Sequence, residues 1–151
     1  MDIPFFDADT LIDAEEMQLL RDGEYDQIAR DKFVKKLISQ VDVLLSSPKQ
    51  DLIVAEAFTK EKNRYEFMDH FPGNVCYIMI NTPIGLAKER AQQRCVVGKH
   101  VINDIAFEHI WSEFETPRFL YFSLSNVDIP DVQLVHEFTR LIELVHHRRG
   151  D

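Results

Sequence analysis

The chain has 151 residues, of which 45% are hydrophobic, and this composition excludes a disordered or low-complexity protein. Its length fits one domain of ordinary size, and its formal net charge of -9 argues against nonspecific binding to nucleic acids or acidic membranes. There is no signal peptide and no apolar run long enough to span a bilayer, and the cysteines Cys76 and Cys95 suggest neither a disulfide framework nor a metal site, so we expect a cytoplasmic protein without a membrane partner.

Two carboxylates follow directly on the first apolar stretch. Ile3, Phe5 and Phe6 favour a strand, and Asp7 and Asp9 would project to the same side if that strand continued through them. Ligands of open α/β sheets lie beyond the carboxyl ends of the strands. Two acids there could hold a hydrated metal ion and take a proton from a hydroxyl group. The alternative is that Asp9 is the N-cap of the next helix and that Asp7 is solvated.

Two helices and a second strand are expected next. Residues 13–21 predict a short helix that Gly23 stops. A longer helix over 26–45 has apolar residues at steps near 3.6, which predicts one buried stripe. The residues of that stripe are Ile28, Phe33, Leu37, Val41 and Leu44. The apolar run within 51–57 is closed by an acid, a pattern typical of a strand covered on both faces.

Helices and strands continue to alternate to the end of the chain. The predicted elements are a helix at 60–70, a strand at 75–80, a helix at 83–94, a mobile loop at 96–102, a helix at 103–117, a strand at 119–124 and a helix after Pro130. In the helix at 103–117 the residues on one face are Phe107, Ile110, Trp111 and Phe114, and in the last helix they are Val135, Phe138, Ile142 and Val145. This alternation predicts an α/β fold with a mainly parallel sheet.

Several motifs resemble the small-molecule P-loop kinases of the gluconokinase and shikimate kinase group. In the first half these are Phe6–Leu11 and the strand end Val54–Lys60, with Arg64 following. The later match is denser, since Arg90–Arg94 precedes Gly98-Lys99-His100 and a helix that ends in Trp111–Pro117. That order is similar to the lid region of gluconokinases. The resemblance implies a three-layer, parallel-sheet, adenylate kinase-like fold, with residues 1–151 as one kinase-like domain and a short lid around 95–104.

The resemblance also implies roles for the two acids, together with ATP and Mg²⁺ as cofactors and a small-molecule substrate. Asp9 matches the acid that lies against the acceptor hydroxyl as a general base or orienting group. Asp7 matches the acid that holds the magnesium ion through water. Phosphoryl transfer otherwise needs mainly positioning and neutralisation of phosphate charge.

Cations for that neutralisation are available at matching positions. Arg90 and Arg94 lie on successive turns of one helix face, where catalysis and ATP binding would use them, and Lys99 could add a third cation from the lid. Lys60 and Arg64 lie beyond the second strand, where a substrate anion would be held. The alternative for the helical cations is a solvated face that pairs with Glu61 or Glu89, and we expect His100 to be a lid residue without chemistry.

Two departures from the pattern stand out. Ile12 occupies the position of a gluconokinase histidine, which puts gluconate as the substrate in doubt. The sequence also contains no GxxxxGK[ST], and none of its glycines (Gly23, Gly73, Gly85, Gly98 and Gly150) are spaced to build such a loop. We therefore expect a domain truncated at its N-terminus, without its first strand and P-loop, lacking a βα unit of roughly thirty residues.

That expectation has a structural consequence. In the resembled fold the missing strand lies between the strands that begin here at Asp51 and Val75. Unpaired buried backbone groups cost about 1–3 kcal/mol each. We therefore expect two apolar strands to face a gap or to pair directly, and the chain to form a homo-oligomer through exposed sheet edges.

Three functions remain open at this point. The leading one is ATP-dependent phosphoryl transfer to a hydroxyl of a small polar metabolite, impaired in this chain alone. The second is a non-catalytic remnant that binds a metabolite or a protein. The third is a hydrolase with Asp7 as nucleophile, which leaves Arg90, Arg94 and the Glu113–Pro117 ending unexplained.

Overall fold

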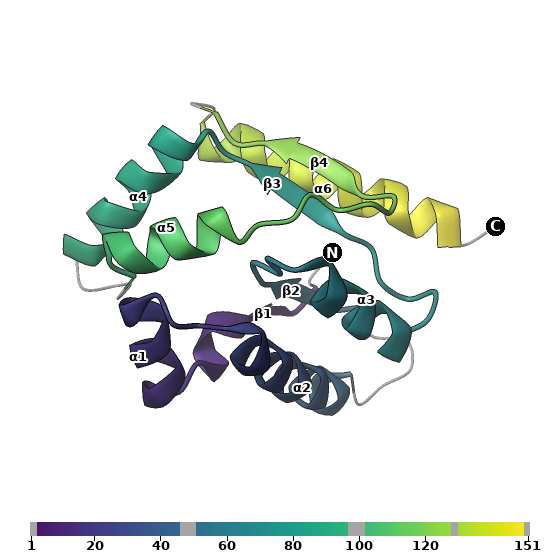
Figure 1. Cartoon of the computed structure of the whole chain (residues 1–151). Coiled ribbons are helices and arrows are strands. Elements are labelled where there is room, and N and C mark those ends of the chain that lie inside the picture. Colours follow the sequence, from purple (N-terminus) through teal and green to yellow (C-terminus); the bar gives the residue numbers. More distant parts are fainter. Residues whose placement is uncertain (1–2, 46–50, 97–101, 128–129, 150–151) are drawn as a thin grey trace. The chain divides into compact units, whose positions relative to one another are not determined.

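The computed structural model describes residues 3–45, 51–96, 102–127 and 130–149 (Figure 1). Its elements are, in chain order, β1 (Phe5–Asp7), a 3₁₀ helix (Ala8–Leu11), α1 (Ala14–Asp22), α2 (Gln27–Leu44), β2 (Ile53–Ala55), α3 (Glu61–His70), β3 (Ile78–Asn81), α4 (Ile84–Val96), α5 (Asp104–Ser112), β4 (Phe122–Ser125) and α6 (Asp131–Arg149). Each predicted helix is present, but the helix expected over 103–117 ends at Ser112, so Phe114 lies beyond it. The fold class predicted from the sequence, α/β, is therefore confirmed.

The chain divides into two compact units. The first comprises Met1–Gly73 and Val101–Thr116, and the second comprises Asn74–His100 and Pro117–Asp151. The expectation of a single domain stays a prediction. No helix in the described part of the chain combines the length and the apolar character needed to cross a membrane.

Each unit contains one pair of parallel strands. In the first unit β1 pairs with β2, with Asp7 opposite Ala55, and in the second unit β3 pairs with β4, with Ile78 opposite Phe122. The parallel arrangement predicted from the alternation of elements is confirmed. Among the described residues these are the only strand pairings, so the expected sheet is divided into two pairs and β2 does not pair directly with β3. Self-association through sheet edges stays a prediction.

The strands of the second unit begin later than predicted, at Ile78 and at Phe122 rather than at 75 and 119. The residues just before them are held by ring packing, since the Tyr77 and Phe119 rings lie 4.9 Å apart. Leu120, which the pattern placed in the strand, is fully exposed.

Strand β2 is also less enclosed than its sequence suggests. Ile53, Val54 and Ala55 are all half-buried, so the prediction of a strand covered on both faces is wrong for the described residues. The reason is that β2 belongs here to a two-stranded sheet, in which β1 is its only partner among the residues described.

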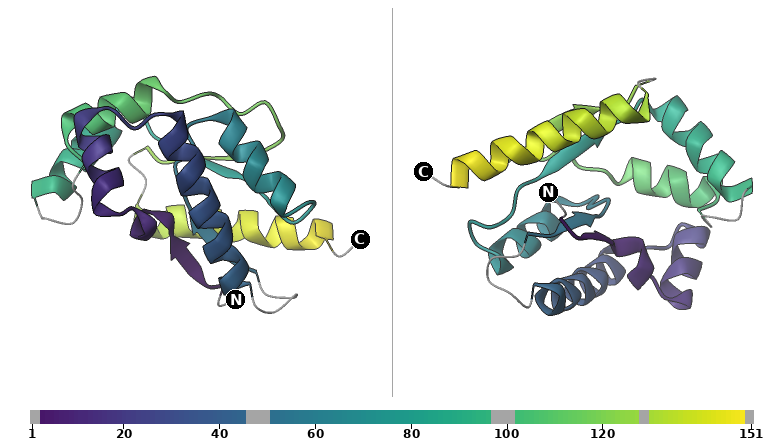
Figure 2. Two further views of the ribbon diagram at one scale, coloured as in Figure 1. Left: turned by 60° about the horizontal axis from the view of Figure 1, so that its bottom comes forward. Right: turned by 180° about the vertical axis from the view of Figure 1, so that it is seen from behind.

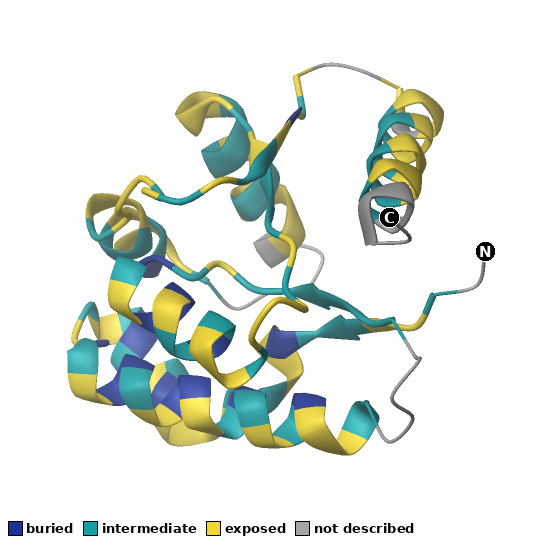
Figure 3. Ribbon diagram, turned by 90° about the vertical axis from the view of Figure 1, so that its right-hand side faces the viewer, coloured by how far each residue is buried: buried dark blue, intermediate teal, exposed yellow. Residues whose placement is uncertain are grey.

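The core of the first unit is built on α2. Its buried apolar stripe repeats every fourth residue, through Ala29, Phe33, Leu37 and Val41 (Figure 3). Ile28 was expected in this stripe but is 78% exposed, because it lies one residue, or about 100°, away from Ala29 around the helix. Helix α3 lies beside α2 (Figure 2, left).

Local capping explains where α1 begins and ends. Asp13 and Glu16 form a capping box, in which each side chain accepts a hydrogen bond from the other residue's backbone N–H at 2.9 and 3.0 Å. Gly23 ends the helix in the left-handed conformation, at φ 71°. A Cβ atom at Gly23 would lie 3.2 Å from Ile105 Cγ2 of α5, so glycine also permits the close approach of that helix.

The apolar faces of α5 and α6 are more exposed than the periodicity predicted. In α5 the fully buried residue is Ala106, while Trp111 is 45% exposed. In α6, which packs against β4, Val135 is exposed while Phe138, Ile142 and Val145 are half-buried.

Leu37 offers a test of this core, because its side chain is fully buried. We expect Leu37→Ala to lower the free energy of unfolding by about 2–5 kcal/mol, since it removes apolar burial and leaves a cavity. Denaturant-induced unfolding followed by circular dichroism measures the change. The matched control is Ile28→Ala on the same helix, for which we expect a change within about 0.5 kcal/mol. Equal destabilisation by the two variants would contradict the assigned stripe.

Candidate functional site

Strand β1 ends at Asp7, and the chain turns at once into the 3₁₀ helix Ala8–Leu11. The strand therefore does not continue through Asp9, and the condition for Asp7 and Asp9 to project to the same side of a strand is not met. Asp7 is the N-cap of this short helix, since its Oδ1 accepts a hydrogen bond from the Asp9 backbone N–H at 3.1 Å. The suggestion that Asp9 caps the next α-helix is wrong, because Asp13 has that position in α1.

A third acid, Glu56, lies at the end of the neighbouring strand β2. Burial raises the pKa of its carboxyl to about 7, and the charges of Asp9 and Asp7 act in the same direction, against a hydrogen bond from the Phe58 N–H at 3.2 Å. Sequence analysis did not select Glu56. The available signal was an acid that closes an apolar strand, next to another strand that ends in acids.

The loop after Glu56 has a strained backbone. Phe58 has φ of +32°, which residues other than glycine seldom adopt. Its ring packs edge-on against Phe67 of α3, with the centroids 5.3 Å apart. The loop then passes through the buried Thr59 to Lys60, the residue immediately before α3.

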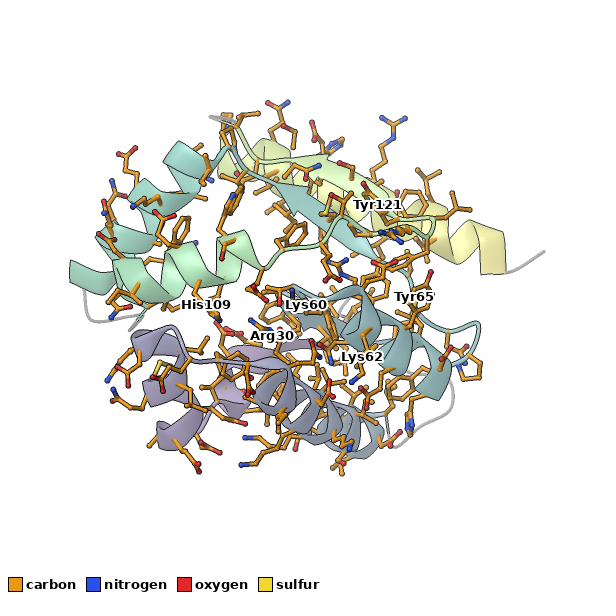
Figure 4. All side chains as sticks on the ribbon, viewed as in Figure 1. Arg30, Lys60, Lys62, Tyr65, His109 and Tyr121 are labelled. Carbon is orange, nitrogen blue, oxygen red and sulfur yellow. The ribbon has the colours of Figure 1, made fainter. Side chains whose placement is uncertain are left out.

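Lys60 lines a pocket of about 410 Å³ within the first unit. The lining residues come from the α1–α2 turn, α2, the start of α3 and the end of α5. They are Gly23, Glu24, Tyr25, Asp26, Gln27, Arg30, Lys60, His109 and Glu113. Figure 4 shows Arg30, Lys60 and His109 in the same region of this unit.

The cations of this pocket share one lining carboxylate. Lys60 Nζ lies 2.7 Å from Glu113 Oε2, and Arg30 Nη1 lies 3.9 Å from the same oxygen. The hydrogen bond with Glu113 raises the pKa of Lys60, and that with Lys60 lowers the pKa of Glu113. The lining also contains Glu24 and Asp26, so three carboxylates accompany the two cations. Donors and acceptors of this mixed kind suit a hydroxyl-rich group.

Arg30 is buried and held from two sides. Its guanidinium lies over the Tyr25 ring, 5.5 Å from the centroid, and Nη2 lies 3.3 Å from His109 Nε2. The same imidazole nitrogen lies 3.0 Å from the Tyr25 carbonyl oxygen. It can donate to that carbonyl or accept from Arg30, so the tautomer of His109 decides which contact is a hydrogen bond.

Tyr25 links the pocket to the ends of the strands. Burial raises the pKa of its hydroxyl well above the usual range, and the charges of Glu16 and Glu56 raise it further. Glu56 in turn interacts with Asp9 and Asp7. The acids at the ends of β1 and β2 therefore lie near the pocket within one unit, with Tyr25 between them.

Arg64, the other predicted substrate residue, is buried rather than solvated. Its Nη1 lies 2.9 Å from Glu61 Oε2, and its guanidinium lies over the Phe114 ring, 5.0 Å from the centroid. The pairing with Glu61 that we considered as its alternative is present. Its role toward a substrate stays a prediction.

The predicted phosphate-binding cations belong to the second unit. Arg90 of α4 is half-buried, with Nη1 3.5 Å from the Asn126 carbonyl oxygen, and Arg94 of α4 is exposed. Lys99 and His100, and with them the centre of the predicted lid, lie outside the described residues. The roles of these residues stay predictions.

The residues present fit a nucleotide and its metal only in part. Asp7 offers carboxylate oxygens of the kind Mg²⁺ prefers, but no cluster of three or more potential metal ligands occurs among the described residues. The sequence also lacks the glycine-rich loop whose backbone N–H groups surround phosphates. The described residues therefore do not form a complete nucleotide and metal site.

Comparisons with known proteins identify the fold and no family. No family model matches the sequence, and no curated protein matches it. The structure has a mixed α/β fold with parallel strands. It is similar to the crystal structure of a gluconokinase from Sinorhizobium meliloti 1021, with a TM-score of 0.71, 18% sequence identity, and coverage of 97% of this chain and 82% of that one.

Glu56 leads to a test by pH. Because its native pKa, about 7, is above the ordinary 4.5, the native state keeps a proton that the unfolded chain releases. This group therefore makes stability fall as pH rises from about 4.5 to about 7. We expect Glu56→Gln to stabilise the protein at pH 8 by about 1–3 kcal/mol and to change it little at pH 4.

Chemical denaturation at both pH values measures this difference. The control is Glu143→Gln at an exposed position of α6, for which we expect no such dependence. A Glu56→Gln variant that is no more stabilised at pH 8 than at pH 4 would show that the carboxyl is not held protonated.

Proposed function

We propose that this chain acts in ATP-dependent phosphoryl transfer to a hydroxyl group of a small polar metabolite, with transfer by this chain alone impaired, and that the pocket of the first unit binds this acceptor. The observation that supports the proposal most is the closeness of the pocket lined by Arg30 and Lys60 to acids at the carboxyl ends of two parallel strands. Ligands of α/β folds bind at such ends. The similarity in fold to a gluconokinase supports the same class of reaction.

In this proposal Lys60 and Arg30 bind the polar groups of the acceptor. Arg30 is buried, and its contacts with Tyr25 and His109 hold its guanidinium in place. An oxygen-rich acceptor can bind to these cations in place of, or beside, the Glu113 carboxylate. A fixed orientation of the acceptor is the main requirement, since phosphoryl transfer depends on positioning.

We propose that Asp9 orients the reacting hydroxyl and accepts its proton. Asp9 is exposed in the 3₁₀ helix that follows β1, and Asp7 accepts a hydrogen bond from its backbone N–H. A carboxylate positioned beside a hydroxyl group is a suitable general base. Asp7 is the proposed outer-sphere anchor of the magnesium ion.

Arg90, Arg94 and Lys99 are proposed to neutralise the phosphate charge that moves during the reaction. Phosphoryl transfer places that charge on the equatorial oxygens of the transferred group, and arginines stabilise it well.

A second function, binding of a metabolite without catalysis, is favoured by one observation. The chain has no GxxxxGK[ST] motif, and no closely spaced glycines that could take its place. The acceptor pocket does not require that motif, so the pocket could bind its ligand in a protein that transfers no phosphoryl group. Transfer assays with the unmodified chain separate the two functions.

The acceptor role is tested by Asp9→Asn. Asparagine keeps the shape of the side chain but loses the charge and the proton acceptor. In a version of the protein with a glycine-rich phosphate loop restored, we therefore expect kcat to fall by about 10²–10⁴-fold. The assay measures phosphate transfer from radiolabelled MgATP to a panel of polyols and sugar acids. The control is Asp69→Asn at an exposed position of α3, which should keep its activity.

Near-normal turnover in Asp9→Asn would remove Asp9 from the reaction. If the unmodified chain transfers phosphate to no acceptor in the panel but binds one of them, the binding function replaces the catalytic one.

A separate prediction concerns the nucleotide. We expect the 151-residue chain to bind MgATP weakly or not at all, because it lacks a glycine-rich phosphate loop and its lysine. Isothermal titration calorimetry with MgATP measures the affinity. Low-micromolar binding would show that other residues of this chain replace the loop.

A further inference from the structure

The chain segment that follows α5 covers the start of α3. Lys60 is the N-cap residue of α3, and its own side chain makes no capping hydrogen bond. Instead, Glu115 Oε2 accepts a hydrogen bond of 2.8 Å from the Glu61 backbone N–H. A residue 54 positions away therefore pairs with one of the N–H groups that the first turn of a helix leaves unpaired.

The same residue makes two further contacts with this loop. The Glu115 backbone N–H donates to the Thr59 carbonyl oxygen at 2.8 Å, and Glu115 Oε1 lies 3.4 Å from Lys60 Nζ. Lys60 thus lies between Glu115 and Glu113, and its side chain is only 19% exposed. A free lysine side chain would sample many rotamers, so these contacts restrict where the ammonium group lies.

The loop needs such support, because its own backbone is strained. Phe58 lies two residues before Lys60 and has φ of +32°. Strained residues of this kind persist where the surrounding structure holds them. The surrounding contacts here are the Phe58–Phe67 ring pair on one side and the segment that carries Glu115 on the other.

We propose that Glu115 is a positioning residue of the pocket, which caps α3 in place of a local side chain and so holds Lys60 Nζ against the pocket. Glu115 itself does not line the pocket, so it acts through Lys60. The inference rests on the proposed function only in assuming that Lys60 contacts the ligand.

Glu115→Gln and Glu115→Ala separate this role from a simple effect of charge. Both variants remove the same negative charge beside Lys60, but only glutamine keeps an oxygen that can accept from the Glu61 N–H. A difference between them therefore reports the cap. Thr116→Ala, at the exposed neighbouring position, is the control.

Two measurements need no ligand. We expect hydrogen exchange of the Glu61 amide to be about tenfold faster in Glu115→Ala than in the unmodified chain, and to stay within about threefold in Glu115→Gln. We also expect the two Lys60 Hε protons, resolved by NMR in an ordered side chain, to become equivalent in the alanine variant.

The third measurement uses inorganic pyrophosphate as an anionic probe of the pocket, with calorimetry as the readout. We expect Glu115→Ala to bind pyrophosphate about tenfold more weakly than Glu115→Gln. Equal binding by the two variants, or unchanged Glu61 exchange and Lys60 signals in Glu115→Ala, would overturn the positioning role. If the unmodified chain binds no pyrophosphate, the pocket does not bind this anion, the proposed binding of a polyol is tested by the acceptor panel, and the exchange and Lys60 signals alone decide the role of Glu115.

Discussion

The pocket of the first unit depends on the contact between Lys60 and the two carboxylates, Glu113 and Glu115, that follow α5. It joins the end of β2 and the start of α3 to a segment far along the chain. A largely enclosed ammonium group is costly without partners, and the carboxylates compensate for its desolvation. The loop, the helix start and the pocket wall are all connected through this one side chain.

This acidic chain places two cations on one concave surface, where Arg30 and Lys60 lie among the carboxylates of Glu24, Asp26 and Glu113. Of these carboxylates, Glu113 pairs with both cations. A ligand must compete with that internal carboxylate, which favours ligands able to contact both cations at once.

The fold could be predicted from the sequence to a large extent, because helices and parallel strands alternate with clear periodicity. The predictions failed where packing decides between adjacent residues, as in the choice of Ala29 rather than Ile28 for the buried stripe of α2. They failed again at the ends of strands, which depend on a partner strand. Local patterns contain neither piece of information.

The candidate site was predictable only in part. Lys60 was selected from its place after a strand, and the structure puts it in the pocket. Arg30 and His109 were not selected. The sequence of α2, which contains Arg30, predicts a helix that packs in the core, and the sequence of α5, which contains His109, resembles the region next to the kinase lid. The role of Glu115 could not be predicted from the sequence. It caps a helix that begins 54 positions earlier in the chain, and only the three-dimensional structure brings the two residues together.

The left-handed backbone at Phe58 has a consequence for sequence design on this scaffold. A method guided by local dihedral preferences would place glycine or asparagine there, and a method guided by packing would keep the aromatic ring that contacts Phe67. The natural residue shows that packing prevailed at this position. Libraries that vary this loop should therefore vary positions 58 and 67 together, because neither has a preferred residue independent of the other.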